Sequence, residues 1–292
     1  MKGIILAGGS ATHLRPASKV VCKQLLPVYD KPMIYYPLST LISAGISDIL
    51  IITTQHDADQ FIRLLGDGSD IGCKFTYKIQ TEPRGLAEAF ILGEDFIGKD
   101  RVCLILGDNI FYGGDMHKRL VRAGTQADGV VFAYKVHDPE RYGVVAFDNN
   151  GVALSIEEKP TAPKSQYAVP GVYLYGPDVV EIAKNIQPSD RGELEITEVN
   201  NVYLAQGKLR VEMIDESTQW FDAGTFASLH EVSGSIKAIQ ERQGSLIGSI
   251  ELEAHRAGFI SAEKLHVIAQ ETVKSGYGKV LLEYLEALKK TI

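Results

Sequence analysis

The sequence has few cysteines, no long hydrophobic run and no surplus of basic residues. Its three cysteines, Cys22, Cys73 and Cys103, form no Cys-x-x-Cys pair and are odd in number. This pattern argues against a disulfide framework or a zinc site and favours a reducing cytosol. The apolar run near residue 4 is too short for a signal sequence, and no stretch approaches the roughly 18 apolar residues of a membrane span. We therefore expect a cytoplasmic protein with no membrane contact.

The charge balance disfavours nucleic acid as a partner. Lys and Arg number 30 against 37 Asp and Glu, so the formal net charge is -7. Duplex binding depends on a basic face that neutralises phosphates, and we expect no nucleic-acid partner. The 292 residues are 45% hydrophobic and 23% charged, which suits a folded α/β domain, with or without an appendage.

Short apolar runs alternate with helical patterns in the first half of the chain. Continuous Ile, Leu and Val segments between such patterns are typical of parallel strands covered by helices on both faces. The predicted strands are 4–7, 48–53, 74–79 and 102–106, and the predicted helices are 33–44, 57–65 and 85–97. Ligands of such doubly wound sheets lie at the carboxyl ends of the strands.

From residue 129 to 175 the pattern changes to closely spaced strand-like runs. Asp148-Asn149-Asn150-Gly151 indicates a hairpin turn, because Asn and Gly tolerate positive φ. We expect the sheet to gain antiparallel strands here. The predicted strands are 130–134, 142–147, 153–157 and 169–175, followed by helices at 177–185 and 193–206.

The chain from about Thr225 onward is predicted to be mainly helical, with one short strand near 245–250. We therefore expect two parts. Residues 1–240 would form the core with its inserted strands, and residues 241–292 a mainly helical segment.

The first predicted strand runs into a glycine-rich loop, Gly8-Gly9-Ser10-Ala11-Thr12-His13-Leu14. Small residues after a first strand let backbone N–H groups approach phosphates, although a simple tight turn uses them as well. The loop has neither Gly-x-Gly-x-x-Gly nor Gly-Lys-[Ser/Thr], which argues against a dinucleotide fold and a P-loop. Lys23, further on, is a candidate cation for a phosphate; the alternative is a solvated surface lysine.

Two aspartates are candidate ligands for a divalent cation. Asp108 comes just after the strand predicted at 102–106, at the edge where ligands bind, and Asp222 lies in Trp220-Phe221-Asp222-Ala223-Gly224. Asp oxygens suit Mg²⁺ that bridges phosphates. The alternatives are a strand-capping turn for Asp108 and a helix-start signal for Asp222. Spacing in the sequence leaves open whether the two meet.

The segment Glu157-Glu158-Lys159-Pro160 places a carboxylate beside a lysine. Such a pair could hydrogen-bond sugar hydroxyls and neutralise a phosphate. The alternative is a charged strand end.

Together these segments resemble the bacterial glucose-1-phosphate thymidylyltransferases over nearly the whole chain. The most specific stretches are KGIILAGGS, KQLLPVYDKPMIYYPLSTL, LGDNIFYG, DPERYGVV, EEKP with PKSQYAV, and RGELEITEVN. The resemblance implies Mg²⁺-dependent transfer of a thymidylyl group from dTTP to glucose 1-phosphate, giving dTDP-glucose and pyrophosphate for dTDP-rhamnose synthesis. It also implies an α/β fold with a Rossmann-like mixed, mainly parallel sheet, helices on both faces, inserted sugar-binding strands and a helical C-terminal part. Family members are commonly homotetramers.

The resemblance also assigns roles to individual residues. Catalysis would involve Lys23, Asp108, Asp222 and His13, with Mg²⁺ on Asp108 and Asp222. The nucleotide would be bound by Gly8, Gly9, Ser10, Ala11, Lys23, Gln80, Gly85, Leu86 and Asp108. The sugar phosphate would be bound by Asn109, Tyr142, Gly143, Glu158, Lys159 and Val172. A regulatory nucleotide site at a subunit contact would include Gly113, His117 and Arg256.

The glycine loop departs from the family pattern G-G-S-G-T-R-L at two positions. Ala11 replaces a glycine, so a position that could require positive φ carries a methyl group. His13 replaces an arginine that grips the triphosphate, and a neutral imidazole has one donor where arginine has a charged, bidentate fork. Losing such a contact can cost several powers of ten in rate. Arg15 could substitute in part.

Two other functions stay open from the sequence. The altered loop would suit a weakly active or inactive relative that only binds nucleotide or nucleotide sugar, although the retained Lys23, Asp108 and Asp222 argue against it. A uridylyltransferase is the second alternative. Gln80 could pair with uracil as well as thymine, since the two bases differ by one methyl group worth about 1 kcal/mol of contact.

Overall fold

The computed structural model describes residues 1–9, 11–125 and 127–291. Within these residues the strands of the main sheet are β1 (Lys2–Leu6), β4 (Asp48–Thr53), β5 (Lys74–Ile79), β6 (Val102–Leu106), β8 (Gly129–Lys135), β9 (Gly143–Phe147), β10 (Ala153–Glu158), β11 (Tyr167–Ala168), β12 (Val172–Tyr175) and β13 (Leu209–Met213). Two short ribbons accompany it, β2 (Pro27–Val28) with β3 (Lys31–Pro32) and β7 (Asn109–Gly113) with β14 (Thr218–Asp222).

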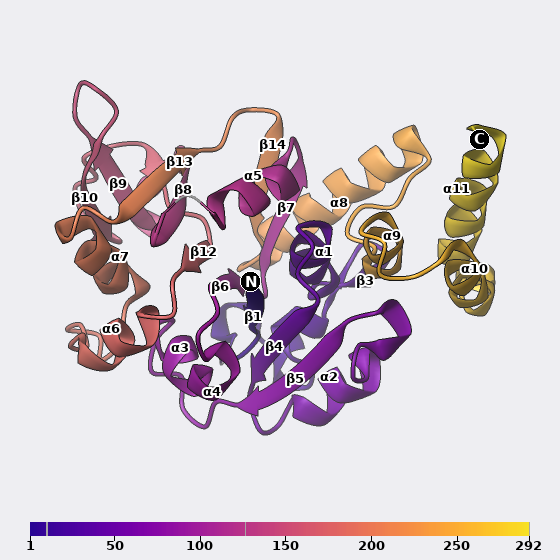
Figure 1. Ribbon diagram of the computed structural model, residues 1–292, viewed down its shortest axis with the longest axis horizontal. Coiled ribbons are helices and arrows are strands. Elements are labelled where there is room, and N and C mark those ends of the chain that lie inside the picture. The colour runs from indigo at the N-terminus through magenta and orange to yellow at the C-terminus, as the bar shows by residue number, and fades with distance from the viewer. Residues whose placement is uncertain (10, 126, 292) are drawn as a thin grey trace.

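The sheet is mixed, as predicted, and its order is β10-β9-β11-β8-β12-β6-β1-β4-β5, with β13 pairing β8 (Figure 1). The strands of the first half, β6, β1, β4 and β5, are parallel, and β1 lies between β4 and β6. The inserted strand β12 joins them to the rest by running antiparallel to both β6 and β8. The carboxyl ends of β1, β5 and β6 therefore share one edge.

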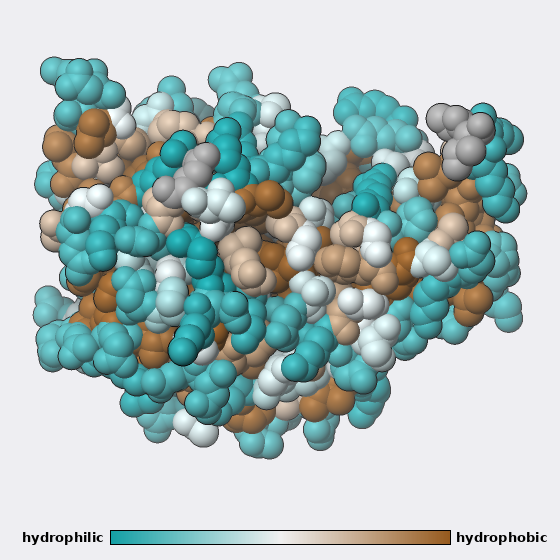
Figure 2. All heavy atoms as spheres, in the orientation of Figure 1, coloured by the Kyte–Doolittle hydropathy of each residue, from teal (hydrophilic) through white to brown (hydrophobic). Residues whose placement is uncertain are grey.

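Helices follow the strands along the chain. Those of the described residues are α1 (Tyr35–Ser43), α2 (Ala58–Leu65), α3 (Glu88–Leu92), α4 (Glu94–Ile97), α5 (Met116–Ala123), α6 (Val179–Asn185), α7 (Ile196–Ala205), α8 (Phe226–Gln243), α9 (Ile250–Arg256), α10 (Ala262–Glu271) and α11 (Tyr277–Thr291). No helix in this part of the chain is long and apolar enough to cross a membrane. Figure 2 shows hydrophilic residues over most of one face, with a band of apolar and weakly polar residues over α1 and α9.

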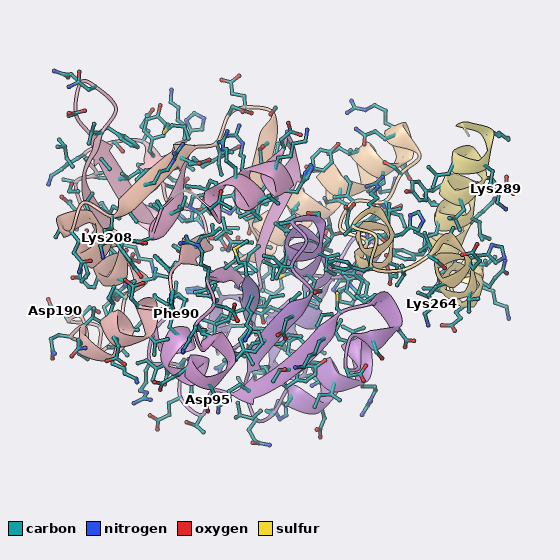
Figure 3. All side chains as sticks on the ribbon, in the orientation of Figure 1. Phe90, Asp95, Asp190, Lys208, Lys264 and Lys289 are labelled. Atoms are coloured by element: carbon teal, nitrogen blue, oxygen red, sulfur yellow. The ribbon has the colours of Figure 1, made fainter. Side chains whose placement is uncertain are left out.

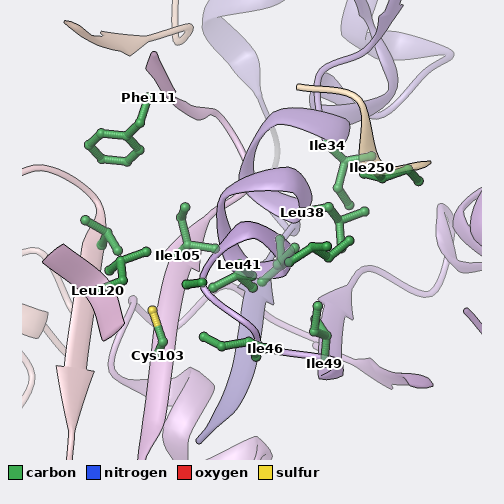
Figure 4. Packing of buried hydrophobic residues seen from close by; sticks show 14 of the residues in the cluster. Ile34, Leu38, Leu41, Ile46, Ile49, Cys103, Ile105, Phe111, Leu120 and Ile250 are labelled. Carbon is green, nitrogen blue, oxygen red and sulfur yellow. The ribbon is translucent and has the colours of Figure 1, made fainter. Parts of the chain in front are cut away.

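Strand alternation divides the interior into two layers, one on each face of the sheet. Ile4 of β1 faces the layer covered by α3, α6 and α7, whereas Ile5 faces the layer covered by α1, α5 and α9. In the first layer, Phe90 of α3 meets the ring of Tyr175 edge-on, with centroids 5.4 Å apart (Figure 3). In the second layer, Leu38 and Leu41 of α1 pack on β4 and β6 (Figure 4).

The C-terminal helices form a further small core. Leu265 and Ala269 of α10 pack on Leu281 and Leu285 of α11, and these two helices lie at one end of the molecule (Figure 1). Helix α9 connects them to the rest, because Ile250 is buried in the layer with α1. The three cysteines are all buried and unpaired.

The predicted strands and helices of the first half are confirmed, with two differences at helix 85–97. It begins only at Glu88, and Gly93 divides it into α3 and α4. The predicted strand near 245–250 is wrong: residues 245–249 form an irregular, bent segment, Ile250 begins α9, and Ser249 caps that helix by accepting from Leu252 N. The apolar residues there pack separately, Ile247 against α8 and Ile250 against α1, so their spacing does not come from a pleated strand.

Truncating Phe90 should test the packing of the first layer. Phe90→Ala should lower the free energy of unfolding by about 3–5 kcal/mol, because it removes a fully buried ring and leaves a cavity against Tyr175. Urea unfolding at equilibrium measures this. The exposed Val152→Ala is the control and should stay within about 0.5 kcal/mol. A loss for Phe90→Ala no larger than that of the control would contradict the packing.

Candidate functional site

The two predicted aspartates meet at the carboxyl edge of the sheet. Asp108 follows β6, and the chain then turns directly into β7. Strand β14 pairs antiparallel with β7 and sets Asp222 opposite Asn109. The backbone N–H of Ala223 donates to the carbonyl of Asp108 at 3.1 Å. A pairing between distant parts of the chain thus brings both carboxylates into one cavity of about 220 Å³.

Lys23 joins this pair. It begins a short 3₁₀ helix, Lys23–Leu25, and its ammonium forms an ion pair with Asp108 Oδ2. Burial opposes the charge on Asp108, but the Lys23 ammonium and hydrogen bonds, including one from Asn109, hold the pKa of this carboxyl below its ordinary value. Asp222 behaves in the opposite way. Burial and the charge of Asp108 raise its pKa, against the lowering effect of Lys23, Arg141 and Lys159.

The side chain of Asn109 forms three hydrogen bonds beside the two aspartates. Its Nδ2 donates to Asp108 Oδ1 at 3.0 Å. Its Oδ1 accepts from the backbone N–H of Gly171 at 2.9 Å and from Trp220 Nε1 at 2.7 Å. These three contacts tie β6, β12 and β14 together at the site, so Asn109 is held rigidly rather than free to turn.

The predicted sugar-phosphate residues lie around the same cavity, with one difference. Asn109, Tyr142, Gly143, Glu158 and Lys159 all line it. Val172 is buried in the layer of α1 on the other face of β12, and its neighbours Gly171 and Tyr173 line the cavity.

Arg141 and Thr197 also line the cavity and Arg191 lies close to Glu158, but none of the three was singled out from the sequence. Arg141 lies with Nη2 3.6 Å from Asp222 Oδ2. Thr197 donates to Glu158 Oε2 at 2.6 Å, and Arg191 Nη2 lies 3.5 Å from Glu158 Oε1. All three lie inside motifs of the sequence, DPERYGVV and RGELEITEVN. The motifs alone do not show which of their side chains face the site, because that depends on the fold.

Most of the predicted nucleotide residues follow β1 or β5 along the chain. Gln80 follows β5, and a Cβ atom at Gly8 would lie 2.8 Å from Gln80 Oε1, so a larger residue at position 8 would displace the Gln80 amide. Gly85 has φ 109°, and a Cβ on it would lie 2.4 Å from the carbonyl of Leu194. Gly9 also has positive φ, and Leu86 lines the cavity of the aspartates. Ser10 lies outside the described residues.

The altered positions of the glycine loop have distinct consequences. Ala11 has φ 42° and ψ 42°, which is the left-handed conformation, so the expectation of positive φ at this position is confirmed. Its carbonyl accepts from Leu14 N at 3.0 Å and from Ser18 Oγ at 2.7 Å, contacts that hold it there. His13 lies in the following 3₁₀ turn, Thr12–Leu14, and is exposed.

A second cavity of about 530 Å³ lies away from the aspartates. Gly113, His117 and Arg256 all line it, although they come from β7, α5 and α9. It lies against α1 and α9, where Figure 2 shows the band of apolar and weakly polar residues.

The family model described as nucleotidyl transferase matches residues 2–238. The chain therefore belongs to the nucleotidyl transferase family. The glucose-1-phosphate thymidylyltransferase of Mycolicibacterium smegmatis is 55% identical over 286 residues, 98% of this chain and 99% of the relative. That of Neisseria meningitidis serogroup A is 53% identical over 287 residues, 98% of this chain and 100% of the relative. The resemblance found in the sequence is thereby confirmed.

Solved structures agree on the fold. A crystal structure from Bacillus anthracis, assigned as a glucose-1-phosphate thymidylyltransferase and complexed with sucrose, aligns with TM-score 0.75 and 44% identity. The alignment covers 80% of this chain and 94% of that one. A UDP-glucose pyrophosphorylase complexed with UDP-glucose aligns with TM-score 0.71 over 82% of this chain and 98% of that one. At 24% identity, this second likeness shows the fold alone.

Replacing Ala11 by glycine should relieve backbone strain in the loop. The left-handed conformation costs a non-glycine residue about 1–2 kcal/mol, so Ala11→Gly should stabilise the loop against local opening by roughly 1 kcal/mol. Amide hydrogen exchange of residues 11–19 measures this opening. Ala17→Gly, at an ordinary helical position, is the control and should loosen the same segment. Faster exchange in Ala11→Gly would contradict the strain.

Proposed function

We propose that this protein transfers a thymidylyl group from dTTP to glucose 1-phosphate, giving dTDP-glucose and pyrophosphate, with Mg²⁺. The observation that carries the proposal is the convergence of Asp108 and Asp222 on a cavity that also holds Glu158 and Lys159, with Lys23 paired to Asp108. The names of the curated relatives support dTTP and glucose 1-phosphate as substrates, rather than binding without turnover. We also propose a cytoplasmic location, in line with a metabolic enzyme.

The residues present fit a divalent cation. The charge of Asp108 raises the pKa of Asp222, and a cation between the two would relieve this repulsion. Among the described residues there is no group of three or more His, Cys, Asp or Glu that could hold a metal. Two carboxylates suffice for Mg²⁺, which completes its shell with water and substrate phosphates. When bound, Mg²⁺ would neutralise phosphate charge during the transfer.

The chemistry needs no nucleophile from the protein. A phosphate oxygen of glucose 1-phosphate attacks the α-phosphorus of dTTP, and pyrophosphate leaves from the opposite side. The attacking oxygen is already anionic, so the chain contributes positioning and charge neutralisation. Lys23 would contact the phosphates of dTTP, with Gly8, Gly9, Ser10 and Ala11 lining the triphosphate and His13 beside it. Lys159 would hold the phosphate of the sugar.

The two substrates would approach from different sides of the aspartates. Gln80, Gly85 and Leu86 follow β5 along the chain, and the thymine and ribose would bind beside them. Asn109, Tyr142, Gly143 and Glu158 lie on the inserted-strand side, where the glucose would bind. Held in this way, the two phosphates face each other beside Asp108 and Asp222.

We also propose that residues 1–240 form the catalytic core and residues 241–292 a segment used in assembly of a homotetramer. The family model that ends at residue 238 and the separate core of α10 and α11 support this division.

The cavity lined by Gly113, His117 and Arg256 is our candidate for a regulatory nucleotide site. Its volume, about 530 Å³, suits a ligand of nucleotide size. Arg256 offers a guanidinium to a phosphate, although it now pairs with Glu253 Oε1 at 2.7 Å.

Replacing either Asp108 or Asp222 by Asn should abolish the binding site for the cation. Asp108→Asn and Asp222→Asn should each lower pyrophosphate release from dTTP and glucose 1-phosphate by at least about 100-fold, because one ligand and its charge are lost. Calorimetry of dTTP with and without Mg²⁺ gives the second readout, and the metal-linked gain in affinity should disappear. Asp95→Asn, exposed at the rim in Figure 3, is the control. Full metal-linked affinity in Asp222→Asn would refute the proposal.

Two nucleotide sites per chain are expected if the second cavity is regulatory. Calorimetry with dTDP should find two sites per chain in the wild type and one in Arg256→Ala, because the phosphate loses its guanidinium. Basal pyrophosphate release should stay within about twofold, since Arg256 lies outside the cavity of the aspartates. Lys264→Ala, a surface cation on α10, is the control. Two sites of unchanged affinity in Arg256→Ala would contradict this role.

A further inference from the structure

The side-chain amide of Gln80 is held on one side by a buried acid. Gln80 follows β5, and its backbone N–H donates to the carbonyl of Thr53 at 2.8 Å. Its Nε2 donates to Glu88 Oε2 at 2.7 Å. Glu88 is the first residue of α3, and both side chains are buried. The contact is therefore buried, next to the carboxyl end of β5, and does not lie on the surface.

Glu88 decides which way the amide of Gln80 faces. A carboxylate only accepts hydrogen bonds, so it must meet the NH₂ group of the amide and not its oxygen. Gln80 Oε1 is thereby turned toward the glycine loop, 2.8 Å from where a Cβ atom of Gly8 would lie. The amide presents a fixed acceptor to that side, with the second hydrogen of Nε2 beside it.

Arg84 in turn fixes Glu88. Its Nε donates to Glu88 Oε1 at 2.8 Å, its Nη2 lies 2.6 Å from the same oxygen, and its backbone N–H donates to Oε2 at 3.2 Å. The side chain of Glu88 is 3% exposed and that of Arg84 62%. A buried carboxylate needs such charge-assisted bonds, and they leave Glu88 little freedom to turn away from Gln80.

A fixed amide distinguishes between two classes of pyrimidine. Thymine and uracil carry a hydrogen on N3 between two carbonyl groups, whereas cytosine has a bare N3 beside an amino group. An amide that is free to turn about its last torsion pairs with either class by exchanging its oxygen and nitrogen. An amide that cannot turn pairs well with one class and sets acceptor against acceptor for the other.

We propose that Glu88 is a positioning residue for nucleobase specificity. It locks the Gln80 amide so that the site takes triphosphates of bases with an N3–H, and rejects those of cytosine. The proposal rests on the proposed function, in which Gln80 faces the base. Turning the amide to suit cytosine would set its oxygen against the carboxylate of Glu88, so rejection is built in as repulsion. The lock treats thymine and uracil alike.

The isosteric variant Glu88→Gln tests the lock, because a glutamine at 88 can donate or accept and so releases the amide of Gln80. The measurement is kcat/KM for dTTP and for dCTP with glucose 1-phosphate and Mg²⁺. The wild type should prefer dTTP by about 100-fold or more, and Glu88→Gln should reduce this preference about tenfold. A residue that only supports the fold would lower both rates together and leave their ratio unchanged.

Arg84→Met is the second variant, and it keeps Glu88 but removes its partner. Arg84→Met should also reduce the preference for dTTP over dCTP, by less than Glu88→Gln does. If Glu88→Gln does not fold, Arg84→Met supplies the test of the lock. Glu94→Gln, at the first residue of α4, is the control. An unchanged ratio in folded Glu88→Gln, or in Arg84→Met where Glu88→Gln does not fold, would overturn the inference. A wild type that takes dCTP as readily as dTTP would overturn it too.

The failure of the proposed function looks different. In that case the wild type releases no pyrophosphate from either triphosphate. The dissociation constants of dTTP and dCTP, measured by calorimetry without the sugar phosphate, then supply the same ratio and decide the role of Glu88 on binding alone.

Discussion

The rest of the site depends on two carboxylates that are forced together. Asp108 lies in the turn after the parallel strand β6 and Asp222 ends the ribbon strand β14, and the pairing of β14 with β7 sets Asp222 opposite Asn109. Their repulsion is offset only in part by Lys23, which forms its ion pair with Asp108. Burial and the charge of Asp108 together raise the pKa of Asp222, as expected for two carboxylates held close to each other.

The two ends of the site are connected through the backbone. The N–H of Leu194 donates to the carbonyl of Arg84 at 2.7 Å, and the N–H of Ala87 donates to the carbonyl of Leu194 at 3.1 Å. Gly85 is pressed against Leu194 at the same point, where any Cβ atom would collide. The segment that carries Arg84 and Glu88 therefore lies directly on the segment that carries Arg191 and Glu195. Each of the two segments contains an ion pair between a buried glutamate and an exposed arginine. These pairs are Glu88 with Arg84 and Glu195 with Arg191.

The sequence predicts the features that depend on local pattern. It does not predict which side chains from distant segments meet. Buried strands such as Asp48–Thr53 follow from continuous apolar residues, and the glycine loop and Asp108 follow from their place at strand ends. The meeting of Asp222 with Asp108 is non-local, and only the β7–β14 pairing supplies it. The segment near 245–250 was predicted as a strand because Ile247 and Ile250 are apolar, yet they belong to different cores. Glu88 and Arg84 look in the sequence like the charged start of a helix, and their bond to Gln80 depends on how α3 meets β5.

The altered glycine loop weakens the positive charge of the site without removing it. The imidazole of His13 is exposed and cannot reproduce a bidentate guanidinium. Arg141 and Lys159 still line the cavity, and Lys23 reaches it through Asp108. Arg141 lies close to Asp222, so it is placed to balance the charge of that carboxylate. Because the reaction relies on charge neutralisation and positioning rather than on a protein nucleophile, the loss of one cation changes its rate and leaves its course intact. Ala11 adds backbone strain to the same loop, because its left-handed conformation is costly for a residue with a Cβ atom.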